Sequence, residues 1–308
     1  MDADGDLDLV ATNWGLNTKY QHISADHPQQ LFAADFAGLG RVEPVEAKTE
    51  GGQLVPVRGR SCSSHAIPFL REKFTSYRAF ASASLEEIYG AERLQSATRL
   101  EVTTLASMML RNDGSAVFTA EPLPWEAQLS PAFGVVAEDF DQDGWMDLWI
   151  AQGHAVAQRE TGRQTGGLPV LLRGQGGGRL AAVSPARSGL SWRGDVRAAV
   201  LLDGHTLLMT VNDAAARVAV APALQAAGVR RLGLRPRGGG ANAAGTRVTA
   251  TLADGRPWMR EVNGGGGYGS QSSSTLAIPA GVSEVTVRWP DGTSSRHPVP
   301  TSGLLRQP

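Results

Sequence analysis

Apolar residues along most of the chain recur at the short intervals typical of β-strands, and glycine, proline or Asp-Gly closes each run. In the first two thirds of the chain the pattern predicts strands at residues 7–12, 31–35, 41–47, 98–105, 107–111, 116–119, 133–138, 148–150, 170–173 and 179–183. A second series is predicted at residues 232–235, 246–252, 258–262, 275–278 and 284–289. The pattern therefore predicts an all-β fold of short strands.

Residues 68–93 interrupt this β pattern. Their apolar side chains recur at helical intervals, at Phe69, Leu70, Phe74, Tyr77, Phe80, Leu85 and Ile88. Ser84 followed by Glu87 has the form of a capping box at the start of a helix. We expect a helical insertion here, packed on the rim of the β structure, with its aromatic residues in a core.

One short loop carries carboxylates at the spacing of a calcium site. The acids at loop positions 1, 3, 5 and 9 are Asp139, Asp141, Asp143 and Asp147. Gly144 at position 6 permits a sharp bend, and the backbone carbonyl of Trp145 at position 7 would add an oxygen ligand. The loop resembles an EF-hand loop that closes three residues early and leads into a strand. A calcium ion would relieve the repulsion among these acids, whereas the alternative is an acidic turn with solvated side chains.

An imperfect copy of this loop lies at the start of the chain. When Asp8 is aligned with Asp147, Gly5 takes position 6, and the acids of the copy are Asp2, Asp4, Asp6 and Asp8. Position 1 then falls one residue before Met1, so we expect an N-terminally truncated sequence in which Asp or Asn precedes Met1. Because that ligand is missing, the copy is predicted to be a weaker second metal site.

Two further copies of the loop are more degenerate. The stretch from Asp35 to Glu43 keeps acids only at positions 1 and 9, and residues 194–211 keep only a strand–turn–strand outline. Two acids rarely hold calcium, so we interpret both stretches as structural turns. Repeats of about 40 to 60 residues, each forming one four-stranded sheet, are typical of a β-propeller.

Composition narrows the classes of function. The 308 residues can form two domains, and 37 glycines with 19% charged residues suit a turn-rich β protein. The 29 basic and 30 acidic residues give a formal charge of −1, so there is no electrostatic case for binding nucleic acid or an anionic membrane. No apolar run is long enough to span a bilayer. Cys62 is the single cysteine, and we interpret it as structural.

The sequence resembles two known repeat and domain families. The loop from Asp139 to Asp147 with its following strand is similar to the calcium-binding FG-GAP/VCBS repeat of integrin-alpha-type propellers. Four C-terminal motifs have the order and spacing of the ASPIC/UnbV domain: Asn242-Ala-Ala-Gly245, Arg260-Glu261-Val262, Tyr268-Gly-Ser270-Gln271 and Trp289-Pro290-Asp291-Gly292. Together these parts resemble bacterial members of the cartilage acidic protein-like family, which are secreted proteins.

This resemblance implies a propeller fragment at residues 1–228, followed by a small β-sandwich-like ASPIC/UnbV domain at residues 229–308. The first segment has room for only about four to five blades, whereas the family usually has about seven, which again indicates a fragment. A second departure is the stretch 238–241, Gly-Gly-Gly-Ala, which replaces a more polar stretch of the family. The resemblance implies calcium at the acidic loop and assigns no reaction to the C-terminal motifs.

The C-terminal motifs also have structural interpretations. Trp289 is expected to close the small core, and Arg260 with Glu261 to form a cross-strand charge network. Tyr268 and its neighbours lie on a glycine-rich loop that could line a binding surface, although we favour a packing role. No catalytic constellation is visible, because the histidines lack zinc-helix spacing and there is no Gly-x-Ser-x-Gly elbow.

We therefore expect a calcium-binding module that acts outside the cell or in the cell envelope and recognises a protein or glycan partner. Calcium loops of modest affinity work best where calcium is millimolar, which favours that location. The alternative is a secreted hydrolase or lyase acting on polysaccharide or ester substrates. That alternative rests on analogy with other propellers.

Overall fold

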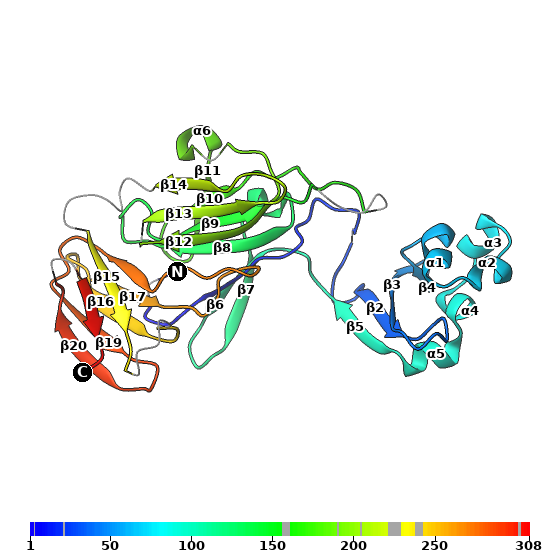
Figure 1. Ribbon diagram of the computed structural model, residues 1–308, viewed down its shortest axis with the longest axis horizontal. Helices are drawn as coiled ribbons and strands as arrows, with labels where there is room; N and C mark the ends of the chain where they lie inside the picture. The colour runs from blue at the N-terminus through cyan, green and yellow to red at the C-terminus, as the bar shows by residue number, and fades with distance from the viewer. Residues whose placement is uncertain are drawn as a thin grey trace. The chain divides into compact units, whose positions relative to one another are not determined.

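The computed structural model describes residues 1–2, 4–20, 22–155, 161–189, 191–203, 205–220, 229–237, 243–300 and 303–308. Backbone contacts divide the chain into two compact units, one formed by Met1–Thr18 with Ala106–Pro308 and the other by Lys19–Leu105. The second unit is inserted in the connection between β1 (Leu9–Ala11) and β6 (Met108–Asn112), which pair with each other (Figure 1).

The inserted unit combines one antiparallel sheet with short helices. Its sheet has the strand order β4-β3-β2-β5, with β2 at Gln29–Ala34, β3 at Glu43–Glu50, β4 at Gln53–Pro56 and β5 at Thr98–Val102. Its helices are α1 (Arg60–Ala66), α2 (Leu70–Lys73), α3 (Tyr77–Ala81), α4 (Leu85–Tyr89) and α5 (Ala91–Ser96). The predicted capping box is present at the start of α4, where Ser84 and Glu87 each accept a bond from the other's backbone N–H.

The helical stretch is longer than the predicted 68–93, because α1 begins at Arg60 and α5 ends at Ser96. Helix α1 has the sequence Arg-Ser-Cys-Ser-Ser-His-Ala, which contains too few apolar residues to produce a periodic signal. Leu70, Leu85 and Ile88 lie in the core as expected. Tyr77 was also expected in the core, but this prediction is wrong: Tyr77 is 65% exposed, and the Arg60 guanidinium lies over its ring.

Three antiparallel sheets make up the first part of the larger unit. The strand order of the first is β1-β6-β7, with β7 at Phe118–Pro122, and the second has the order β11-β10-β9-β8. The strands of the second sheet are β8 (Ala132–Glu138), β9 (Asp147–Gln152), β10 (Val170–Gly174) and β11 (Leu180–Val183). The third sheet contains β12 (Val196–Leu202), β13 (Thr206–Val211) and β14 (Arg217–Val220), and the 3-10 helix η1 (Trp125–Gln128) and α6 (Pro185–Ser188) lie in connections.

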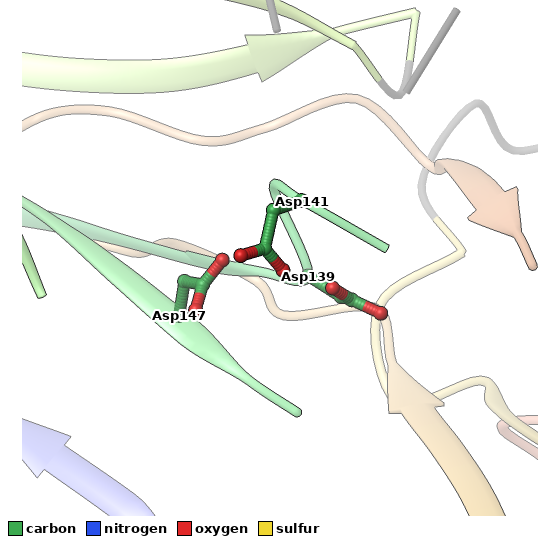
Figure 2. Close-up of side chains that lie close together, drawn as sticks. All are labelled: Asp139, Asp141 and Asp147. Carbon is green, nitrogen blue, oxygen red and sulfur yellow. The ribbon is translucent and has the colours of Figure 1, made fainter. Parts of the chain in front are cut away.

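Strand β9 is buried on both faces. Trp149 and Ala151 pack into the core shared with the β12–β14 sheet, whereas Leu148 and Ile150 pack into the core shared with β6. This explains its continuous apolar run, because alternation disappears when both faces of a strand are covered. The hairpin from β8 to β9 carries Asp139, Asp141 and Asp147 (Figure 2). The all-β prediction is confirmed, but none of the described sheets closes on itself, so the propeller stays a prediction.

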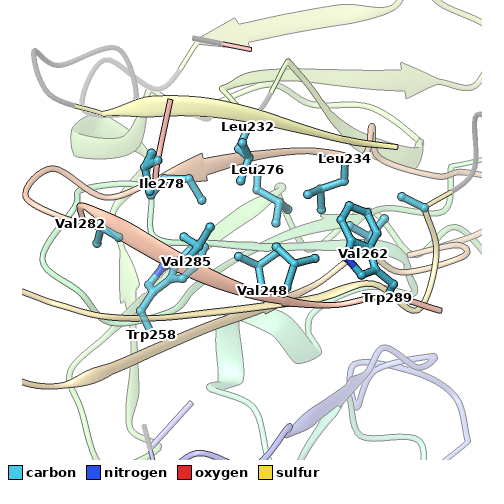
Figure 3. Packing of buried hydrophobic residues seen from close by; sticks show 13 residues of the cluster. Leu232, Leu234, Val248, Trp258, Val262, Leu276, Ile278, Val282, Val285 and Trp289 are labelled. Atoms are coloured by element: carbon cyan, nitrogen blue, oxygen red, sulfur yellow. The ribbon is translucent and has the colours of Figure 1, made fainter. Parts of the chain in front are cut away.

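Two sheets enclose the core of the C-terminal part. One has the order β18-β15-β21 and the other β17-β16-β19-β20. The strands are β15 (Arg230–Arg235), β16 (Arg247–Thr251), β17 (Pro257–Glu261), β18 (Thr275–Ile278), β19 (Glu284–Arg288), β20 (Ser294–Pro298) and β21 (Gly303–Arg306). Figure 3 shows their apolar side chains meeting between the sheets, and Trp289 is 1% exposed, as expected. The predicted boundary between the two domains falls at residues 221–228, which lie outside the described residues.

Candidate metal centre

The β8–β9 hairpin brings the two ends of the acidic loop together. Glu138 of β8 pairs with Asp147 of β9, so Asp139 and Asp147 lie side by side at the base of the loop. Asp141 lies above them on the loop, and its carboxylate lies near both of the others (Figure 2). One ligand oxygen from each of these three acids lies within 4.8 Å of the others.

Backbone amides fix the positions of the two basal carboxylates. Asp139 accepts hydrogen bonds from the N–H groups of Asp143 (3.1 Å) and Gly144 (2.9 Å). Asp147 accepts from the N–H of Phe140 (2.9 Å) and from the N–H of Gly174 (2.8 Å), the last residue of β10. The carboxylates therefore shape the loop before any ion is bound.

Burial makes the charged forms of these two acids costly. Asp139 is 3% exposed and Asp147 is 1% exposed. Burial raises the pKa of Asp139 to about 6 and that of Asp147 to about 7, although backbone N–H groups partly oppose the shift. Repulsion from Asp141 raises both pKa values further. A divalent cation among the three oxygens would offset this cost, and an all-oxygen donor set suits a hard cation.

Asp143 has a different environment from the other three acids. Its Oδ1 accepts from the backbone N–H of Trp145 (2.9 Å), and its Oδ2 lies 2.8 Å from Nη2 of Arg173. Nε of Arg173 lies 2.6 Å from Oδ2 of Asp141. Three of the four predicted carboxylates therefore converge, and Asp143 lies outside this cluster although it shares Arg173 with Asp141. Ligation by Asp143 and by the carbonyl of Trp145 stays a prediction.

In the loop at the start of the chain, the acid at position 9 is Asp8, and it makes the same kind of hydrogen bonds as Asp147. Asp8 accepts from the N–H of Asn112 (2.9 Å), the last residue of β6, just as Asp147 accepts from the end of β10. The other oxygen of Asp8 pairs with the amino group of Met1, which aligns with Phe140. Asp8 thus connects the first loop to β6, and Asp147 connects the second loop to β10.

The middle of the first loop also matches. The N–H of Asp4 lies 3.3 Å from Oδ1 of Asp2, and the N–H of Asp6 lies 2.9 Å from Oδ1 of Asp4. The equivalent distances in the second loop, Asp143 to Asp141 and Trp145 to Asp143, are 3.3 and 2.9 Å. The two loops therefore share one backbone arrangement. Among the described residues, which omit Ala3, the acids of the first loop form no comparable cluster, and its weaker metal site stays a prediction.

The loop that begins at Asp35 keeps the arrangement of position 1. Asp35 accepts from the N–H groups of Leu39 (2.9 Å) and Gly40 (2.7 Å), four and five residues later, as Asp139 does. These bonds lower the pKa of Asp35. Glu43 at position 9 accepts from the N–H of Ala37 (3.2 Å). The interpretation as a structural turn agrees with these contacts.

Two arginines of the C-terminal part contact the acidic loop. Nη2 of Arg256 donates to the backbone carbonyl of Asp143 (3.0 Å), and its guanidinium lies 4.5 Å from the ring centroid of Trp145. Arg260 forms a buried ion pair with Glu138, the last residue of β8. The expected cross-strand charge network is confirmed for Glu261, which pairs with Arg247 on the neighbouring strand β16 (3.0 Å). Arg260, the preceding residue, faces the other side of the strand and pairs with Glu138 instead.

The glycine-rich loop of the C-terminal part pairs with β8. Gly267 forms a bridge with Gly134, and the N–H of Tyr268 donates to the carbonyl of Phe133 (2.8 Å). A Cβ on Gly267 would lie 2.8 Å from Cα of Gly134, so this approach requires glycine. The side chain of Tyr268 is 74% exposed, so the favoured packing role is wrong for this residue.

A cavity of about 580 Å³ lies between the two acidic loops and β17. Asp8 and Glu261 are among its lining residues. Asp8 is paired with Met1 and Asn112, and Glu261 is paired with Arg247. Asp6 lines the cavity as well, and the alternative of a hydrolase or lyase stays a prediction.

These features define a class of protein, namely an all-β protein of several antiparallel sheets with an acidic hairpin that could hold a metal ion. Residues 237–303 match the family model described as ASPIC and UnbV. The expected ASPIC/UnbV domain is thereby confirmed for this segment. No curated protein matches the chain. Among the described residues, no helix has the length and apolar character required to cross a membrane.

The contacts of Arg173, Arg256, Arg260 and Glu138 at the acidic loop were not predicted from the sequence. The first three contact the acidic loop or its base across 30, 113 and 122 residues of sequence, respectively. Only the placement of Arg173 at the end of a strand that follows the loop could have suggested a contact.

Proposed function

We propose that this chain is a calcium-binding module with blades of the FG-GAP/VCBS type, related to the cartilage acidic protein-like family. In this proposal it acts outside the cell or in the cell envelope and recognises a protein or glycan partner. The observation that carries the proposal is the convergence of Asp139, Asp141 and Asp147. The repeated backbone arrangement of the first loop supports a repeat architecture.

Calcium suits this centre better than magnesium. Calcium accepts carboxylates and backbone carbonyls in flexible geometry, whereas magnesium requires a near-ideal octahedron and retains several waters. The oxygens here come from a short hairpin whose acids already serve as acceptors for backbone amides. The bound ion would connect the end of β8 to the start of β9 and would stabilise the fold by mass action.

An aromatic cluster supports a recognition role. The rings of Trp14 and His154 lie 5.6 Å apart, and those of Phe133 and Tyr268 lie 6.4 Å apart. The guanidinium of Arg197 lies 4.1 Å from the ring centroid of Phe133. Tyr268 is the exposed ring of this cluster, and an exposed aromatic face beside polar groups suits a sugar ring or an extended peptide. Glycan and protein arrays with wild type and Tyr268→Ala would test this role, and equal binding by both would count against it.

The calcium proposal is tested by thermal unfolding of the full chain in calcium and in EDTA. Calcium is expected to raise the Tm of the wild type, and Asp141→Asn is expected to remove most of that increase. Asp141 is exposed, so its substitution disturbs the metal-free fold less than a change at Asp139. Asp35→Asn is a control for the loss of one aspartate charge in a similar turn, because Asp35 occupies position 1 of a loop that lacks the three-acid cluster. Identical melting of the wild type in calcium and in EDTA would contradict the proposal.

A further inference from the structure

Arg173, at the end of β10, is bound to two acids of the candidate metal loop. Its Nε lies 2.6 Å from Oδ2 of Asp141, and its Nη2 lies 2.8 Å from Oδ2 of Asp143. One guanidinium therefore bridges positions 3 and 5, which the loop spacing assigns to the cation. Asp141 belongs both to this bridge and to the three-acid cluster.

We propose that Arg173 is an internal competitor of the cation and lowers the affinity of the loop for calcium. The inference rests on the proposed calcium function and deepens it. In the metal-free loop, the guanidinium neutralises Asp141 and Asp143. Calcium would lie beside Asp141, which already belongs to the cluster, and Asp143 must turn toward the ion to bind it, so Arg173 must release both acids.

Asp141 and Asp143 cannot bind the Arg173 guanidinium and a calcium ion at the same time without bringing two cations together. A guanidinium that remained on Asp141 would lie next to a divalent ion and repel it. The side chain of Arg173 is 46% exposed, so it can move into solvent when it is displaced. Exposed ion pairs contribute little to stability, so displacement costs little. Arg173 therefore weakens calcium binding without preventing it, which sets the loop to respond at high calcium concentrations.

The first loop contains a natural comparison. Arg111 precedes Asn112 at the end of β6 as Arg173 precedes Gly174 at the end of β10, and both following N–H groups bind a position-9 acid. Nε of Arg111 lies 3.0 Å from Asp113 and its Nη1 lies 2.7 Å from Glu121. Arg111 thus occupies the equivalent position and binds acids outside its loop. An arginine at this position is not required to bridge the loop acids.

The test is calorimetric titration of calcium into the full chain at constant ionic strength. Arg173→Gln is expected to lower the Kd by roughly fivefold to tenfold, the equivalent of two exposed ion pairs. Arg111→Gln should leave the Kd of the Asp139 loop unchanged, and Arg173→Lys should stay near the wild type because it keeps the charge. The double variant Arg173→Gln with Asp141→Asn should lose the tight binding, which assigns it to this loop.

The outcomes separate this inference from the calcium proposal. An unchanged or weaker affinity of Arg173→Gln, with calcium binding by the wild type, would overturn the competitor role and leave the calcium proposal intact. No binding by either the wild type or Arg173→Gln would overturn both. A Tm of metal-free Arg173→Gln close to that of the wild type would show that the comparison concerns folded protein.

Discussion

The buried carboxylate of Glu138 forms an ion pair with Arg260. Glu138 is the last residue before the acidic loop, and Arg260 lies on β17 inside the segment matched by the ASPIC and UnbV model. Their side chains are 5% and 10% exposed. The pair therefore connects the base of the candidate metal centre to the C-terminal part in a place that water hardly reaches.

Breaking this pair is expected to be strongly destabilising. Glu138→Gln leaves the Arg260 charge buried without its partner, and a loss of about 3 to 5 kcal/mol in unfolding free energy is typical of such a change. Urea denaturation would measure the loss. The matched double variant, Glu138→Gln with Arg260→Met, removes both charges and should recover part of it. A loss below about 1 kcal/mol for Glu138→Gln would show that the pair contributes no more than an exposed one.

Gly144→Ala should disturb the acidic loop more than the same change in the first loop. Gly144 has a φ of 86°, and a Cβ there would lie 2.5 Å from Nη2 of Arg256. Gly5 has a φ of 104° and no atom within 4 Å of its would-be Cβ. Gly5→Ala is therefore expected to cost about 1 to 2 kcal/mol from backbone strain alone. Gly144→Ala should cost about 1 kcal/mol more, because Arg256 must leave the carbonyl of Asp143.

Denaturant unfolding of both glycine variants measures this difference. If the two substitutions cost the same, the contact between Arg256 and the loop contributes nothing to stability. The comparison is sensitive because both glycines occupy position 6 of equivalent loops and both have positive φ.

The stability of the metal-free protein should fall as the pH rises through the range set by Asp139 and Asp147. Burial raises their pKa values to about 6 and about 7, from the ordinary aspartate value of 3.8. Between pH 4 and pH 7 the folded state therefore holds more protons than the unfolded state, and stability decreases with rising pH. Urea midpoints in EDTA across this range would show the slope.

Calcium should reverse that trend, because the ion binds deprotonated carboxylates and its binding releases protons. The Tm increase produced by calcium is thus expected to be larger at pH 7.5 than at pH 5. The variant Asp139→Asn with Asp147→Asn should lose both effects. A calcium effect of equal size at the two pH values would exclude these buried acids as the ligands.

Local spacing was enough to predict the acidic hairpin, the apolar strand after it and the capping box at Ser84. These features depend on residues within about ten positions of one another. Tyr77 matched the helical period and is nevertheless exposed, because periodicity places a residue on a face and tertiary packing decides whether that face is covered. Strand β20 was missed because its sequence, Ser-Ser-Arg-His-Pro, lacks the apolar alternation of a strand.

The candidate centre was predicted only in part for the same reason. The spacing of the four aspartates shows which side chains lie on one turn. It does not show that Arg173 binds Asp143, or that Arg256 and Arg260 reach the loop and its base from another sheet. Those contacts depend on how the sheets pack, and no periodic pattern records that packing.

Calcium binding at the β8–β9 hairpin is tested by a crystal structure of the protein grown in calcium, with anomalous difference density measured at a long wavelength. We predict one strong peak within coordination distance, about 2.3 to 2.6 Å, of carboxylate oxygens of Asp139, Asp141 and Asp147. The peak should be absent from crystals of Asp141→Asn grown in the same solution. Featureless density among these three acids at saturating calcium would show that the hairpin does not bind calcium.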